Sequence, residues 1–78
     1  MKELIRYIAT SLVDQPESVQ VNEKEQEDLV LIELTVAKED LGKVIGKQGR
    51  TARAMRSLLT ASAAARAENM RARLEILE

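Results

Sequence analysis

The chain contains no cysteine and no histidine, and these two absences exclude most kinds of active site. Without cysteine there are no disulfides and no thiolate metal ligands, and without histidine the commonest metal ligand and general base is missing. The remaining carboxylates and amines form no paired arrangement typical of catalysis. We therefore expect no enzymatic activity, no metal and no cofactor in these 78 residues.

Aromatic side chains are also scarce, because Tyr7 is the only one and neither Phe nor Trp occurs. Proteins that bind single strands by base stacking need aromatic platforms, worth about 1–3 kcal/mol per base, and this chain cannot build one. Tyr7 lies at a helical position, where we expect it to be half-buried. Any binding of nucleic acid must then rely on charge and backbone groups.

Long hydrophobic runs are missing as well. No stretch of 18 apolar residues occurs, and Lys2, Glu3 and Arg6 interrupt the apolar residues near the start. These features predict neither a membrane span nor a signal peptide, so we expect a cytoplasmic protein without membrane contact. No repeat or linker divides the sequence, and a chain of this length holds one small core. Residues 1–78 are therefore predicted to form a single domain.

The net charge of −1 conceals a strong segregation of charge along the chain. Residues 1–40 carry ten acidic and four basic side chains, a net −6, whereas residues 41–78 carry eight basic and three acidic ones, a net +5. Local charge matters more than the total, since the Debye length at physiological salt is about 8 Å. The basic residues that gather around two glycines are Lys43, Lys47, Arg50 and Arg53.

Apolar spacing predicts three helices. The first covers residues 2–13 and ends before Pro16, because the residue preceding a proline disfavours the helical region. The second is expected over Lys38–Ile45 and ends at Gly46. The third runs from about Arg50 to Ala67, with a left-handed cap at Asn69. Its predicted inward-facing residues are Met55, Leu58 and Leu59, with close approach at Ala52, Ala54, Ala61 and Ala63.

Alternating apolar residues predict three strands. A short first strand around Val19 and Val21 leads into an acidic turn, Asn22–Asp28, and a second strand, Leu29–Val36, forms a hairpin with the first. A third strand covers residues 71–78, where one face is apolar and the other charged. The resulting order of elements is αββααβ.

The segment Gly46-Lys47-Gln48-Gly49 has the composition of a phosphate cradle. Glycine adopts positive φ and lets another backbone approach, so the intervening amides and Lys47 are available to an anion. A Walker A loop would need four residues between its glycines and Lys-Ser or Lys-Thr at its end, and a dinucleotide loop would follow a strand. Neither description fits. A simple structural turn between helices remains open for the two glycines considered alone.

A helix-turn-helix motif is the other structural alternative. Its recognition helix presents several polar side chains to base edges. The helix after Gly49 begins with Arg50, Arg53 and Arg56 and then becomes mostly alanine and leucine. The predicted strands also fit poorly with a plain helix-turn-helix protein.

The run Val44-Ile45-Gly46-Lys47-Gln48-Gly49-Arg50, with Met55 further along, resembles the signature of KH domains, and the αββααβ order resembles their prokaryotic type. The resemblance spans nearly the whole chain. It implies an α+β fold, a single KH domain over residues 1–78 in which a three-stranded sheet packs against three helices.

The resemblance also implies a function, which is binding of single-stranded RNA. A KH loop clamps about four nucleotides by the sugar-phosphate backbone, and the bases lie over an apolar groove. We expect Val44, Ile45 and the strand Leu29–Val36 to help form that groove, although core packing is an alternative role for Val44 and Ile45. The predicted RNA-binding residues are Gly46, Lys47, Gln48, Gly49, Lys43, Arg50, Arg53, Val44 and Ile45.

Few phosphate contacts and no stacking imply weak, salt-sensitive binding by one domain, which a second domain would strengthen. The family implies a homodimer or a heterodimer with a larger Jag-type KH protein, acting as an RNA chaperone or post-transcriptional regulator. An alternative is a protein-interaction adaptor or dimerisation module whose loop is vestigial and whose function lies in the dimer surface or the acidic turn Asn22–Asp28.

Overall fold

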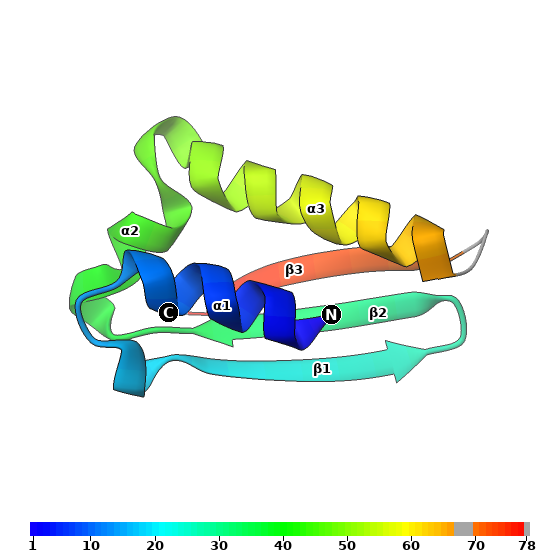
Figure 1. Cartoon of the computed structure of the whole chain (residues 1–78), viewed down its shortest axis with the longest axis horizontal. Coiled ribbons are helices and arrows are strands. Elements are labelled where there is room, and N and C mark those ends of the chain that lie inside the picture. Colours follow the sequence, from blue (N-terminus) through cyan, green and yellow to red (C-terminus); the bar gives the residue numbers. More distant parts are fainter. Residues whose placement is uncertain (67–69, 78) are drawn as a thin grey trace.

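The elements follow one another in the predicted order αββααβ (Figure 1). The computed structural model describes residues 1–66 and 70–77. Short 3₁₀ turns at Pro16–Ser18, Lys38–Asp40 and Lys47–Gly49 connect the longer elements. The helices are α1 (Lys2–Leu12), α2 (Leu41–Ile45) and α3 (Arg50–Arg66), and the strands are β1 (Gln20–Gln26), β2 (Leu29–Thr35) and β3 (Arg71–Leu77).

β2 is the central strand of a three-stranded sheet with the order β1-β2-β3. β1 is antiparallel to it, with Gln20 opposite Thr35, and β3 is parallel to it, with Leu29 opposite Arg71. Parallel neighbours need a crossover connection, which α2 and α3 provide. The segment between these two helices therefore lies on the crossover, at one end of the molecule (Figure 1).

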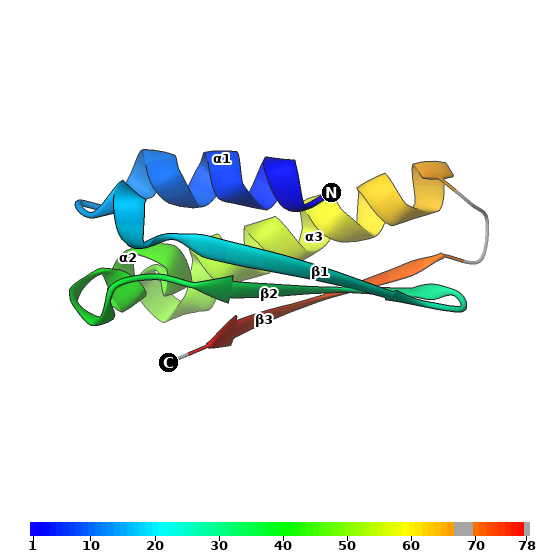
Figure 2. The same ribbon diagram turned by 90° about the horizontal axis from the view of Figure 1, so that it is seen from below.

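The core lies between α1, α3 and one face of the sheet, while no helix of residues 1–66 or 70–77 covers the opposite face (Figure 2). Val30, Ile32 and Leu34 alternate along β2 and are completely buried. Each large aliphatic side chain buried in this way contributes about 1.5–3 kcal/mol. The buried residues from the other elements include Ile5 and Ala9 of α1, Val21 of β1, Met55, Leu59 and Ala63 of α3, and Leu74 of β3.

The first strand is longer than predicted. The expected turn Asn22–Asp28 is mostly strand, because β1 continues to Gln26 and only Glu27 and Asp28 form the turn. β1 is an edge strand, and of its seven residues only Val21 is buried. Because most side chains of β1 are charged or polar, the strand shows no alternating apolar pattern. Its backbone nevertheless pairs with β2, whatever the side chains are.

Several residues of α1 and α3 are more exposed than predicted. Leu58 is 47% exposed, since Met55, Leu59 and Ala63 form the stripe of α3 that faces the core. Tyr7 is 73% exposed, because the core-facing stripe of α1 is made by Ile5 and Ala9. Of the alanines expected to allow close approach, Ala52 and Ala63 are buried, whereas Ala54 and Ala61 are exposed.

The predicted helix Lys38–Ile45 consists of two parts. A 3₁₀ turn precedes α2, and Asp40 joins them with φ −98° and ψ −3°, outside regular α-helical geometry. The predicted helix end at Ala67, the cap at Asn69 and the strand end at Glu78 lie outside the described residues. None of the helices formed by residues 1–66 and 70–77 is long and apolar enough to span a membrane.

Candidate nucleic-acid interface

The loop, defined as Gly46–Gly49, has a backbone that requires glycine at two positions for different reasons. A Cβ at Gly46 would overlap the side chain of Thr51 and lie 2.8 Å from its backbone nitrogen, and φ there is +78°. Gly49 has φ +73° but no neighbour within 4 Å of a built Cβ. Gln48 has φ +56°, the left-handed region that non-glycine residues seldom occupy. Gly46 is needed for space and conformation, Gly49 for conformation only.

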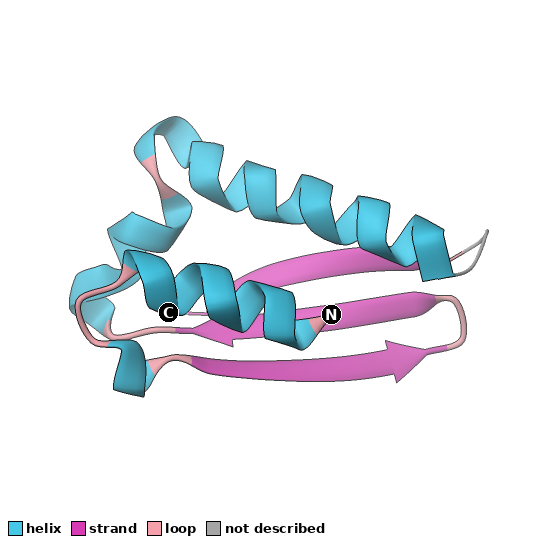
Figure 3. Ribbon diagram, in the orientation of Figure 1, coloured by secondary structure: helices cyan, strands magenta, loops and turns pink. Residues whose placement is uncertain are grey.

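Two amide groups at the tip of the loop have no acceptor. The N–H of Gly46 donates to the carbonyl of Gly42 at 2.9 Å, and the N–H of Gly49 donates to that of Gly46 at 3.0 Å. Within the described part of the chain, the N–H groups of Lys47 and Gln48 make no such bond. They adjoin the start of α3, where the helix dipole favours an anion (Figure 3).

The cations beside the loop keep their charge uncompensated. Lys47, Arg50 and Arg53 are exposed, and no carboxylate of the described residues lies within 4.0 Å of them. Arg50 Nη2 donates to Gln48 Oε1 at 3.1 Å, which ties the side chain of Gln48 to the start of α3. The loop end is therefore positive despite the acidic composition of the whole chain.

Lys43, predicted to belong to the same group of cations, is placed differently. Its Nζ lies 2.9 Å from Asp14 Oδ2 and 3.5 Å from Asp40 Oδ1. The hydrogen bond to Asp14 and the negative charges of both carboxylates raise the pKa of Lys43 above its ordinary value. Its ammonium group is thus held by the protein itself, unlike those of the loop.

Asp40 is the one buried charged residue among those described, with 1% of its surface exposed. Its Oδ1 accepts from the N–H of Asp14 at 3.2 Å, and its Oδ2 from the N–H of Gln15 at 2.9 Å. Burial alone would raise the pKa of Asp40, but these hydrogen bonds and the ammonium of Lys43 outweigh it, so the pKa lies below its usual value. Asp40 is therefore ionised at neutral pH.

The residues predicted to form an apolar groove differ in how far they reach the surface. Val44 is 0% exposed and packs in the core, so its side chain has no surface to offer a base. Ile45 is 38% exposed and remains available. The strand expected at the groove corresponds to β2, which is central and has its helix-facing side chains buried. Val36, just beyond β2, lines a hollow near the start of α2, and Leu29 lines hollows at the opposite end of the strand.

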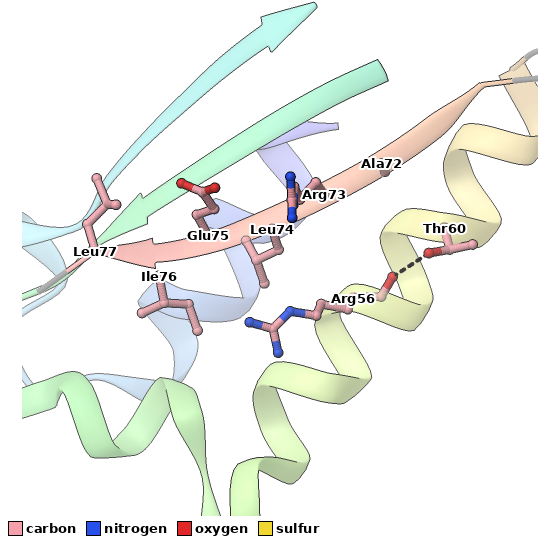
Figure 4. Close-up of a pocket in the computed structure, with 8 residues that line it drawn as sticks. All are labelled: Arg56, Thr60, Ala72, Arg73, Leu74, Glu75, Ile76 and Leu77. Atoms are coloured by element: carbon pink, nitrogen blue, oxygen red, sulfur yellow. Dashed lines mark hydrogen bonds between the residues drawn. The ribbon is translucent and has the colours of Figure 1, made fainter. Parts of the chain in front are cut away.

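The groove that the structure does contain lies between α3 and β3 (Figure 4). Arg56 points across it toward Leu74 and Ile76, whereas Arg73 and Glu75 lie on the other side of β3 (Figure 4). Its volume is about 660 Å³. The lining residues are Arg56, Thr60, Ala72, Arg73, Leu74, Glu75, Ile76 and Leu77.

A smaller apolar hollow of about 340 Å³ adjoins the start of α2 and shares Leu77 with the groove. It is lined by Val36, Lys38, Leu41 and Leu77. The sequence offered one signal for the groove, namely Arg56 three residues after Arg53, but the edge position of β3 depends on parallel pairing. Among the described residues no group of three acidic side chains is placed to hold a metal ion.

The sequence matches one protein family along nearly its whole length. A family model described as KhpA/KhpB, KH domain, matches residues 2–76. The chain is 53% identical over 77 residues to the RNA-binding protein KhpA of Clostridium perfringens, covering 99% of this chain and 100% of that protein. It is 50% identical over 78 residues to the RNA-binding protein KhpA of Chlamydia trachomatis, covering 100% and 97%. The corresponding protein of Treponema pallidum is 53% identical over 77 residues, with coverage of 99% and 94%.

Proposed function

Since the chain belongs to the KhpA/KhpB family of KH domains, we propose that it binds single-stranded RNA and clamps the sugar-phosphate backbone of about four nucleotides at the loop. One observation carries this function. The amides of Lys47 and Gln48 have no acceptor, and the charges of Lys47 and Arg53 have no carboxylate partner, among the described residues. The relatives are named RNA-binding proteins.

Each loop residue has a distinct role in the clamp. The two glycines let a phosphate approach the backbone, and the free amides donate to its oxygens. Lys47 pairs with a phosphate, and Gln48 donates to phosphate or sugar. Arg50 orients Gln48 through the 3.1 Å hydrogen bond, and Arg53 extends the positive field along α3.

The bases lie over the groove between α3 and β3. Val44 supports this surface from the core without touching RNA. Arg56 covers one wall of the groove, and Ile76 provides apolar contact on the other (Figure 4). Without aromatic stacking, each base contributes little, so affinity is modest and depends strongly on salt.

We further propose that the protein acts in the cytoplasm as a non-catalytic RNA chaperone or post-transcriptional regulator, and that it pairs with a second KH domain. The partner is a second copy or a larger Jag-type KH protein. Pairing two weak sites raises the effective affinity through avidity without any new RNA contact. We place the pairing surface at Leu58, an exposed apolar side chain in the middle of α3.

A protein-interaction adaptor is the second candidate function. Tyr7, Leu12 and Leu58 are large apolar side chains that the fold leaves exposed on α1 and α3. An adaptor would use this surface and would not need the loop. Its binding would show little dependence on salt, because burial of apolar surface releases no counterions.

The decisive test replaces Lys47 and Gln48 by Asp and titrates a short single-stranded RNA by fluorescence anisotropy. A matched control, Lys2→Asp with Gln20→Asp, makes the same change in charge at exposed positions of α1 and β1. We expect the loop variant to lose at least tenfold in affinity and the control to keep most of it, with circular dichroism unchanged in both. Equal affinity of the loop variant and the parent would contradict the clamp.

A separate experiment tests pairing. Leu58→Lys places a charge on the exposed middle of α3, and Ser57→Lys places the same charge one residue away. Sedimentation velocity should show a dimer for the parent and for Ser57→Lys, and a monomer for Leu58→Lys. If pairing depends on Leu58 while the loop variant binds RNA normally, the adaptor becomes the better description.

A further inference from the structure

The connector, defined as Asp14–Gln15 between α1 and the next turn, is bound to the segment that leads into α2. Asp40 provides the main link, because each of its two carboxylate oxygens accepts one backbone N–H of the connector, at 3.2 and 2.9 Å. The bonded groups are 26 and 25 residues apart in sequence. A buried carboxylate therefore joins two distant parts of the backbone.

Three further contacts strengthen this junction. Lys43 Nζ lies 2.9 Å from Asp14 Oδ2 and 3.5 Å from Asp40 Oδ1. Gln15 Nε2 donates to Glu39 Oε2 at 2.9 Å. No buried side-chain polar atom of the described residues lacks a partner, so the junction is fully satisfied.

Asp40 occupies the N-cap position of α2 but makes no capping hydrogen bond. An aspartate at this position usually accepts from the first amides of its own helix. Here both oxygens face the connector instead. α2 has only five residues, too few for a helix to be stable by itself, so its orientation depends on contacts with the rest of the fold.

The geometry points to Asp40 and Lys43 as positioning residues that fix α2, and with it the loop, in the orientation that receives a phosphate. Lys43 thereby acts inside the protein and not as a phosphate ligand, unlike Lys47. This inference rests on the proposed RNA clamp. α2 begins immediately after Asp40, and the loop follows its last residue, so a shift of α2 moves the loop amides directly.

Salt dependence distinguishes a phosphate ligand from a positioning residue. Loss of one phosphate contact to a single strand reduces the slope of log affinity against log salt by about 0.7. Lys47→Gln should show this reduction. Lys43→Gln and Asp40→Asn should weaken binding severalfold and keep the slope of the parent, measured well below the melting temperature of each variant. A slope for Lys43→Gln that falls as it does for Lys47→Gln would overturn the inference, as would parental affinity for Asp40→Asn.

Asp14→Asn provides a test with opposite signs and little risk of unfolding, because Asp14 is exposed. If Lys43 is a positioning residue, losing its partner leaves RNA affinity equal or lower. If Lys43 is a phosphate ligand held back by Asp14, affinity rises. In addition, Asp40→Asn should shift the amide resonances of Gly46–Gly49 in the RNA-free protein, and unchanged resonances would count against the inference.

Failure of the clamp itself would look different. In that case Lys47→Gln would retain the parental slope, or the parent would not bind the RNA at all. The junction around Asp40 would then still alter the loop resonances. The two failures are therefore distinguishable in one set of variants.

Discussion

The hairpin end and the loop end each contain a left-handed residue, backbone amides and basic side chains, but they differ in whether these groups have partners among the described residues. At the hairpin end, Glu27 has φ +48°, the N–H of Arg71 donates to the carbonyl of Asp28 at 2.7 Å, and the guanidinium of Arg71 lies 3.5 Å from the Asp28 carboxylate. At the loop end, Gln48 has φ +56°, but the nearby amides and cations lack such partners among the described residues. The ends lie far apart along the longest axis (Figure 1).

The difference shows which property marks a candidate binding site. A left-handed residue occurs at both ends, so backbone conformation alone does not identify the site. Near the hairpin end the guanidinium groups pair within the chain, Arg71 with Asp28 and Arg66 with Glu25, each at 3.5 Å. The loop end keeps its donors and charges available, and these groups are what an RNA backbone can satisfy.

The largest effect is expected from Gly46→Ala, which disrupts the conformation of the loop and leaves the hairpin end unchanged. The added Cβ would collide with Thr51 at a residue with positive φ. We expect the free energy of unfolding to fall by about 2–3 kcal/mol and RNA affinity to fall at least tenfold. Urea denaturation and RNA titration measure the two quantities.

Gly42→Ala is the matched control on α2, since a Cβ there has no neighbour within 4 Å and the backbone is helical. Alanine is favoured over glycine in a helix by about 1 kcal/mol, so this variant should be equally or more stable than the parent. A similar loss of stability in both variants would show that close packing at Gly46 is not the cause.

The next effect compares two arginines of α3. Arg53 lies near the loop without a carboxylate partner among the described residues, whereas Arg66 pairs with Glu25 near the hairpin end. Arg53→Gln should weaken RNA binding by a fewfold with a shallower salt slope, and Arg66→Gln should leave binding unchanged. Because the Arg66 pair is exposed, its loss should cost less than about 1 kcal/mol of stability. Equal weakening by both changes would mean that RNA contacts the whole length of α3.

A smaller effect concerns the left-handed residue found at each end, Glu27 at the hairpin and Gln48 in the loop. Glu27→Gly and Gln48→Gly each relieve a left-handed conformation, so each should raise the free energy of unfolding by up to about 1 kcal/mol. Thermal denaturation should therefore show similar stabilisation at the two ends. RNA affinity should fall only for Gln48→Gly. Weaker binding of Glu27→Gly would indicate that the hairpin end also takes part in recognition.

The smallest expected effect is the pH dependence that Asp40 contributes to stability near neutral pH. Its pKa is lowered by folding from the usual 3.8, so its contribution to stability is complete above pH 3.8 and is lost as pH falls through the lower folded-state value. Lys43, with a raised pKa, loses its contribution only as pH rises beyond 10.5. The difference in melting temperature between the parent and Asp40→Asn should be constant near neutrality and should shrink below pH 4. A difference that varies between about pH 6 and 8 would contradict this assignment.

Much of the fold could be predicted from the periodicity of apolar residues. The alternating residues of β2 and the spacing of Met55 and Leu59 in α3 correctly indicated which side chains are buried. The full length of β1 was not predicted, because its charged residues form an edge strand that is held mainly by backbone pairing. Leu58 was misjudged because two adjacent leucines cannot share one face of a helix, and the sequence does not say which of them faces the sheet.

The candidate site also has one part that the sequence predicted and other parts that it did not. The loop is a local pattern, so glycine spacing and the neighbouring cations predicted its residues. The groove needs β3 to pair in parallel beside α3, and the junction at Asp40 needs contact with residues 25 and 26 positions away. Apart from Arg56, three residues after Arg53, the sequence shows no signal for either of these long-range contacts. Lys43 was therefore grouped with the loop cations by sequence proximity, although the structure engages it with Asp14.

The parallel pairing of β2 and β3 has a consequence for the time course of folding. Ile32 pairs with Leu74, 42 residues further along, whereas β1 and β2 meet across a two-residue turn. The entropic cost of loop closure grows with the logarithm of loop length and precedes any gain from pairing, so we expect the hairpin to form early and β3 to join late. One wall of the groove is β3 itself. A chain in which β3 has not yet paired would lack this wall, so RNA that requires the proposed groove would bind only after the last strand has joined the sheet.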